Sequence, residues 1–429
     1  MIVVVIILVL LGIVIHLLND RFYVYYYLIL YFFVPFIMSI ALQLDEEDNQ
    51  LLTNYSSIFL IGIFIIELVK NKFRMYNPIA LLLFLSLCVY IVVNVIINGA
   101  PIGKYILHFM VSFIVPLFCL SNLFYWNPPQ GDKLRIFIVF IFLTNLVLAF
   151  IQYFADFLVL GFKEDSVTMS SISGTLSGGN GFASFLLLFL LYLLLRENQL
   201  PPRIKWILII AAVVVILLTG VRTYLLCSII FIPLCLIIKN KEKLNPLTAT
   251  LVLVMILIPF AIVIRFNNKG HGTNDADTAI QRQVYGLSTF AKGESADERS
   301  TMFLSLYVFA DYFIEKPILG QWRLYSNESY DLVSPENQNV MDASLAVYLS
   351  DIGVIGMLLY ILFQIQTLMW GGEGEKRKCT LLLYSYVLLT TYTDIGIFSG
   401  SLTCCTFIVC FLLQEENNWD IESQLLEAK

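Results

Sequence analysis

The sequence contains few charged residues for its length. Of its 429 residues, 14% are charged and 59% are hydrophobic, whereas an ordinary soluble protein carries roughly 25% charged residues. A soluble fold could not hold this excess of Leu, Ile, Val and Phe without exposing large apolar patches to water. A lipid bilayer can, so the composition predicts an integral membrane protein. The net charge of −6 gives no indication of a nucleic-acid partner.

Several motifs that carry chemistry in soluble enzymes are also absent. No Gly-rich loop ends in Lys followed by Ser or Thr, so the phosphate cradle of an ATPase is missing. No Gly-x-Ser-x-Gly segment marks a serine hydrolase. The three histidines, His16, His108 and His271, are too scattered for a His-rich metal motif. All eight cysteines lie in or beside apolar runs, which argues against a disulfide framework and against a Cys-based metal site.

Long apolar runs separated by polar breaks fill most of the chain. Because each span needs about 20 apolar residues, we expect an all-α bundle of about 12–13 transmembrane helices. The first run has no preceding Lys or Arg and no cleavage signature, so it is expected to be a retained span. The last run is interrupted at Asp394 and is either one bent span or two. The candidate spans are residues 1–18, 22–42, 53–69, 76–98, 105–124, 134–160, 176–195, 206–219, 221–238, 246–265, 341–369 and 380–413.

Positive charges mark alternate loops. These clusters contain Lys70, Lys72 and Arg74, then Arg196, Arg203 and Lys205, then Lys239, Lys241 and Lys243, and finally Lys376, Arg377 and Lys378. The positive-inside rule places them in the cytoplasm, so the intervening loops, including 161–174 and 267–340, face outward. The side on which Met1 lies is left open.

This orientation divides the chain into four parts. Residues 1–266 are expected to form an N-terminal transmembrane bundle, 267–340 a long outer loop, 341–414 the C-terminal transmembrane helices and 415–429 a cytoplasmic tail. Apolar residues recur at helical spacing between Arg299 and Ile314. That spacing predicts an amphipathic helix, which either lies on the outer membrane surface or caps the bundle.

Two arginines are the candidate anion-binding residues. Arg222 stands at the tip of a short outward turn between two spans, and Arg299 begins the amphipathic segment on the same side. Two guanidiniums facing one outward cavity would suit a diphosphate, because Arg binds phosphate through two donors and stays charged. Snorkelling to lipid headgroups is the alternative for Arg222.

Several acids at membrane depth are candidates for proton chemistry. Asp342 opens the span after the long loop, where it is either a helix N-cap or a general base. Asp351 and Asp394 are further buried-acid candidates. Glu67 is expected near the cytoplasmic end of its span, snorkelling to water.

Three stretches resemble the bacterial O-antigen polymerase and O-antigen ligase superfamily. One is a Gly/Asn-rich turn entering a span, the second a Thr-Gly-x-Arg-Thr turn, and the third an Arg, a Pro-x-x-Gly, an acid and a Gly-x-x-Gly in that order. They are Ser173–Ala183, Leu218–Thr223, and Arg299 with Pro317–Gly320, Asp342 and Gly353–Gly356.

The resemblance implies a multi-pass glycosyltransferase of the bacterial inner membrane with its active site facing the periplasm. Arg222 and Arg299 would hold the diphosphate of an undecaprenyl-diphosphate-linked oligosaccharide, which serves as donor and as acceptor. Asp342 would be the catalytic base, and Asn180 a sugar or structural contact. The resemblance implies an inverting reaction without metal, nucleotide or other cofactor. A protein that sets chain length would be a further partner.

One departure from the family pattern bears on the acceptor. Ligases of the family carry His-Asn eleven residues before the Gly-x-x-Gly, and this chain has Asp342-Ala343 there. The aspartate therefore resembles a polymerase, which would assemble O-antigen or a similar surface polysaccharide. The alternatives are a ligase that passes glycan to another acceptor, and a flippase or transporter of lipid-linked sugars.

Overall fold

The structure is a computed structural model of the whole chain. It describes residues 2–42, 46–75, 77–99, 110, 114–155, 172–176, 179–196, 202–219, 221–239, 318–320, 344–369, 374–391 and 399–427. Within these ranges every regular element is a helix, which confirms the predicted all-α class. The predicted span 246–265 and the amphipathic helix at 299–314 lie outside the described residues, and the division into four parts remains a prediction.

The described helices of the first part of the chain are α1 (Ile2–Leu18), α2 (Tyr23–Phe32), α3 (Val34–Leu42), α4 (Glu46–Lys70), α5 (Pro78–Asn98) and α7 (Val115–Trp126). Helix α4 packs against α1, α2 and α7. The predicted run 22–42 is divided at Phe33, because Pro35 cannot donate the backbone hydrogen bond that would continue the helix.

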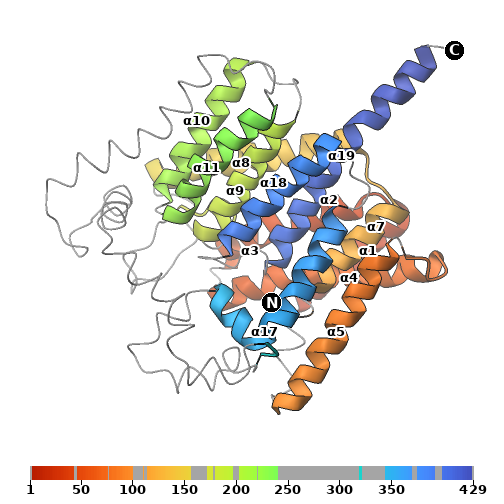
Figure 1. The fold of residues 1–429 in the computed structure, drawn as a ribbon. Helices are drawn as coiled ribbons and strands as arrows, with labels where there is room; N and C mark the ends of the chain where they lie inside the picture. The colour runs from red at the N-terminus through yellow and green to blue at the C-terminus, as the bar shows by residue number, and fades with distance from the viewer. Residues whose placement is uncertain are drawn as a thin grey trace, which may run out of the picture.

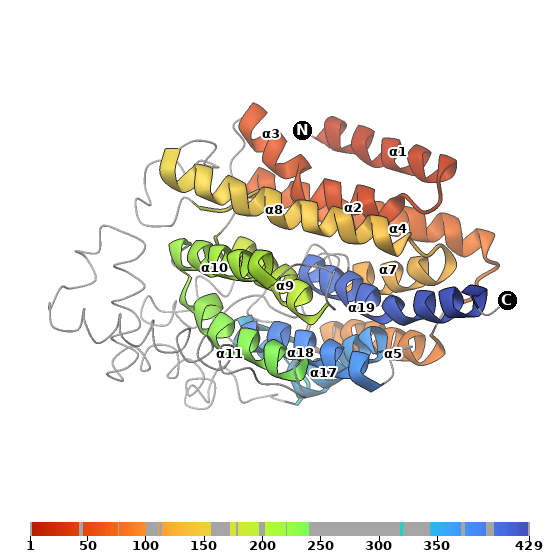
Figure 2. The ribbon, with the colours of Figure 1, turned by 90° about the horizontal axis from the view of Figure 1, so that it is seen from above.

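The remaining helices are α8 (Gly131–Ala155), α9 (Gly179–Leu195), α10 (Pro202–Leu218), α11 (Arg222–Lys239), α17 (Ser344–Leu368), α18 (Gly374–Thr390) and α19 (Gly400–Glu427). Helix α17 packs against α5 and α19. Helix α9 packs against α8, α10, α11, α18 and α19, and it runs between them (Figure 2). Every side chain of residues 182–195 is buried, as expected of a helix that is apolar on all sides. The interrupted run 380–413 is two helices, α18 and α19.

The outer surface of the bundle is apolar. Four helical stretches are long and apolar enough to cross a membrane, namely Tyr23–Ala41, Pro78–Asn98, Gly131–Phe154 and Asp351–Leu368, and further apolar helices are shorter. Helix α5, at the edge of the bundle beside α17 (Figure 1), exposes Leu82, Val89 and Ile96 among others. Such a surface suits lipid rather than water. The chain is therefore a multi-pass membrane protein.

Contacts between residues far apart in the sequence identify the two ends of the bundle. Trp126 Nε1 donates to the Arg74 carbonyl oxygen at 2.8 Å, and His16, near the end of α1, contacts Glu67 near the end of α4. Both contacts lie at the end of the bundle that carries Lys70 and Arg74. The start of α1 therefore lies at the opposite end, which the positive-inside rule predicts to face outward.

Candidate functional site

Arg222 is the first residue of α11, directly after the predicted tight turn. Helix α10 ends at Leu218 and α11 begins at Arg222, which confirms the turn. Thr219 is buried; its hydroxyl donates to the Ile216 carbonyl at 2.7 Å and accepts from the Val221 N–H at 3.4 Å. A helix N-terminus carries partial positive charge, so the backbone there favours an anion. The Arg222 side chain itself lies outside the described part.

The Gly/Asn-rich stretch begins with a buried turn fixed to α8. The Gln152 side chain accepts from the N–H groups of Ser173 and Gly174 at 3.0 and 2.9 Å and donates to the Gly174 carbonyl at 2.9 Å. Asn145 Oδ1 accepts from the Thr175 N–H and hydroxyl at 2.9 and 3.0 Å. Two side chains of α8 thus satisfy backbone groups that would otherwise be unpaired in the membrane.

Gly174 allows this turn to pack closely. Its φ of +59° lies in the left-handed region, and a Cβ there would lie 2.5 Å from Asn145 Oδ1 and from the Phe182 ring. The turn leads into α9, in whose first turn Asn180 lies. The Asn180 side chain is outside the described part.

Helices α9 and α11 bring the first two family stretches to one end of the bundle. They pack against each other, and α10, which precedes the tight turn, connects them. Successive spans alternate in direction, so α9 and α11 both begin at the same end of the bundle. Asn180 and Arg222 therefore begin neighbouring parallel helices.

The third family stretch forms a joint between two distant segments. Residues Ile318–Gly320 lie against a break in α17 at Gly353, where φ is 65° and ψ is −179°. A Cβ on Gly320 would lie 2.3 Å from the Asp351 carbonyl oxygen, and one on Gly353 would lie 2.5 Å from the Gly320 nitrogen. The two backbones can approach this closely only because both residues are glycine.

Helix α5 completes this joint with three polar side chains. The Tyr90 hydroxyl lies 2.7 Å from the Leu319 carbonyl oxygen and 2.8 Å from that of Ile352. Asn94 also donates to the Leu319 carbonyl, and Asn98 donates to the Gly320 carbonyl at 3.1 Å. A Cβ on Gly356 would lie 2.8 Å from the Tyr90 ring. The absence of a side chain at Gly353 therefore makes room for the backbone of Ile318–Gly320, and its absence at Gly356 makes room for the Tyr90 ring.

The predicted catalytic acid and second arginine are not part of the described geometry. Arg299, Asp342 and Asp394 lie outside the described residues. Asp342 stands two positions before Ser344, where α17 begins. Asp351 is buried, as predicted, and lies two residues before the break at Gly353.

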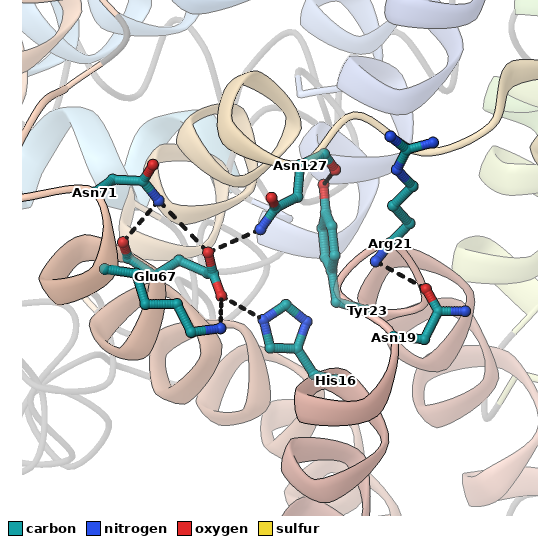
Figure 3. A network of polar contacts seen from close by, with 8 residues as sticks. His16, Asn19, Arg21, Tyr23, Glu67, Asn71 and Asn127 are labelled. Carbon is teal, nitrogen blue, oxygen red and sulfur yellow. Dashed lines mark hydrogen bonds and ion pairs between the residues drawn. The ribbon is translucent and has the colours of Figure 1, made fainter.

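A second polar cluster lies at the end of the bundle that carries Lys70 (Figure 3). Glu67 Oε1 accepts from His16 Nε2 at 2.9 Å and from Lys70 Nζ at 2.6 Å, and Oε2 accepts from Asn127 Nδ2 at 2.8 Å. The Glu67 side chain is only 4% exposed. The expectation that it snorkels to water is wrong, because partners on α1 and after α7 satisfy it inside the bundle.

The sequence analysis did not identify the side chains that bind the Ser173–Thr175 turn and the Ile318–Gly320 segment. Tyr90, Asn94 and Asn98 are spaced four residues apart in an otherwise apolar span, so they share one helix face. That spacing could have identified the three side chains as a polar face with a contact partner. Asn145 and Gln152 are seven apart in α8 and also share a face. Their partners could not be identified, because they are loop backbone groups.

Comparison with known proteins identifies one family over part of the chain. The family model described as O-antigen ligase matches residues 207–361. The match includes Arg222, Arg299, Asp342 and both glycine motifs of the joint, and it excludes Asn180. A search of curated proteins found no match. The chain is therefore a multi-pass membrane protein in which residues 207–361 match the O-antigen ligase domain family.

Proposed function

We propose that the chain is a polymerase that joins undecaprenyl-diphosphate-linked oligosaccharide repeat units at the periplasmic face of the bacterial inner membrane. One observation carries the proposal. Within the stretch matched to a family of glycan-transferring enzymes, Ile318–Gly320 and the Gly-x-x-Gly segment pack together in one joint. Short glycine motifs recur by chance, but a backbone contact that depends on a glycine from each segment supports treating them as one unit.

The proposed mechanism separates charge stabilisation from proton transfer. Arg222, at the N-terminus of α11, and Arg299 bind the donor diphosphate. As the bond between the sugar C1 and the diphosphate oxygen breaks, its electron pair passes to the diphosphate, where the two guanidiniums stabilise the added charge. Asp342 accepts the proton of the attacking hydroxyl on a second lipid-linked unit. Attack from the opposite face inverts the anomeric centre, and undecaprenyl diphosphate leaves.

A ligase is the second candidate, and the matched family is described by that name. The two functions share the donor and differ in the acceptor. Asp342 followed by Ala343, in place of His-Asn, favours the polymerase.

The first test is an in vitro reaction of the purified protein in lipid, without metal or nucleotide. Its substrate is the undecaprenyl-diphosphate repeat unit extracted from the native host lacking this chain. We expect products spaced by one repeat unit. Arg222→Ala and Arg299→Ala should lower the rate by about 10²–10³, and Asp342→Asn by about 10²–10⁴.

A matched control is Arg203→Ala, because Arg203 is an exposed arginine at the opposite end of α10. It should leave the rate within about twofold. Full-length polymer from Arg222→Ala would contradict the diphosphate role. Transfer of the glycan to a different acceptor would establish the ligase, and transport of lipid-linked sugar without any transfer would favour a transporter.

A further inference from the structure

The break in α17 depends on atoms from two other segments. At Gly353 the helical hydrogen-bond ladder is interrupted. The Ile355 N–H donates instead to the Ile318 carbonyl at 3.2 Å, and the Ile352 carbonyl lies 2.8 Å from the Tyr90 hydroxyl. An unpaired backbone group at membrane depth costs several kcal/mol. The break is therefore stable only while Ile318–Gly320 and Tyr90 are in place.

Helix α5 holds both sides of this joint. Tyr90 contacts the carbonyl oxygen of Leu319 on one side and of Ile352 on the other. Asn94 and Asn98 bind Leu319 and Gly320. Asn94 is buried, whereas Val92, Val93 and Ile96 beside it on α5 are exposed. A buried amide in such a helix is expensive unless it serves a specific contact.

One side of the joint leads along the chain to a proposed catalytic group. Asp342 stands two positions before Ser344, where the first half of α17 begins, and that half ends at the break. Loosening the contact between Ile318–Gly320 and Gly353 would therefore change the direction of this half-helix. Transfer between two bound lipids requires near-attack geometry, and a misplacement of about 1 Å can cost about 10²-fold in rate.

We propose that Tyr90, Asn94 and Asn98 are positioning residues for the transfer reaction. They fix Ile318–Gly320 to α17 and so set the direction of the half-helix that Asp342 precedes. This inference rests on the proposed function. It predicts that loosening the joint lowers kcat and leaves substrate binding nearly unchanged.

The test uses Tyr90→Phe, which removes only the hydroxyl. The matched control is Tyr384→Phe, because the buried Tyr384 hydroxyl donates to Gln364 Oε1 at 3.1 Å on the inner half of α17, away from the joint. Steady-state kinetics with the extracted repeat unit and backbone hydrogen exchange are measured for each variant. Asn94→Ala provides a second perturbation of the joint.

For Tyr90→Phe we expect kcat about tenfold lower, KM within twofold, and faster exchange in the peptide containing Ile355. Asn94→Ala should change these quantities in the same direction, and Tyr384→Phe should leave kcat within twofold. Faster exchange with unchanged kcat would reduce these residues to a structural role, and a lower kcat without faster exchange would mean that they do not act through the joint. An inactive wild-type chain would overturn the proposed function as well, whereas an active wild type with an unchanged Tyr90→Phe variant overturns only the positioning role.

Discussion

Glu67 illustrates how much a single buried carboxylate depends on its neighbours. It is paired with His16, Lys70 and Asn127, which come from three parts of the chain. Truncation would leave the buried His16 ring and the half-buried Asn127 amide without this acceptor, whereas the Lys70 side chain, 49% exposed, can turn to water. We therefore expect Glu67→Ala to lower the stability by about 2–4 kcal/mol, measured as a lower thermal unfolding midpoint of the purified protein in detergent.

An exposed acid provides the control for this prediction. Asp132 also pairs with a cation three residues away, Arg135, at 3.1 Å, but its side chain is 73% exposed. Asp132→Ala should change the stability by about 1 kcal/mol or less, because water solvates the Asp132 carboxylate and screens its attraction to the buried Arg135 guanidinium. Equal shifts for the two variants would mean that the Glu67 cluster contributes no more than a surface ion pair.

At the scale of elements, Gly353 makes α17 two half-helices. Its backbone conformation is essentially restricted to glycine, and a Cβ would also collide with Ile318–Gly320. Gly353→Ala should therefore cost about 2–4 kcal/mol, by the same unfolding assay. Gly99, at the end of α5, also has a positive φ but no atom within 4 Å of a Cβ. Gly99→Ala should cost about 1 kcal/mol, and a similar loss for both would show that close packing at the joint adds nothing.

The helices themselves could largely be predicted from the sequence, and their interruptions could not. Apolar runs identified α5, α9 and α11 to within a few residues, because a span must be apolar over its whole length. The break at Gly353 leaves the apolar run intact, since it depends on a segment far away in the chain. The resemblance likewise identified the glycine motifs but not the contact between them, because that contact joins distant segments. The burial of Glu67 was not predicted, because its partners His16 and Asn127 also lie far away in the chain.

At the scale of the whole molecule, the candidate site could be predicted only in outline. Charge alternation indicated which loops face outward, and the structure places Asn180 and Arg222 at the starts of adjacent helices. The side chains that fix these motifs, such as Gln152 and Tyr90, contact backbone carbonyl and amide groups. Backbone groups carry no sequence signature, so such contacts require coordinates.

The same large-scale arrangement makes a prediction about topology. His16 lies beside Glu67 and therefore at the end of the bundle that carries Lys70, whereas Ile2 begins α1 at the opposite end. An epitope tag at residue 1 should bind antibody in intact spheroplasts, because the outer end of the bundle faces the periplasm. A tag after Lys429 should bind only after permeabilisation, since α19 runs from the outer end towards the positively charged one. A protected N-terminal tag would contradict the placement of α1, and two tags accessible from outside would contradict the orientation of α19.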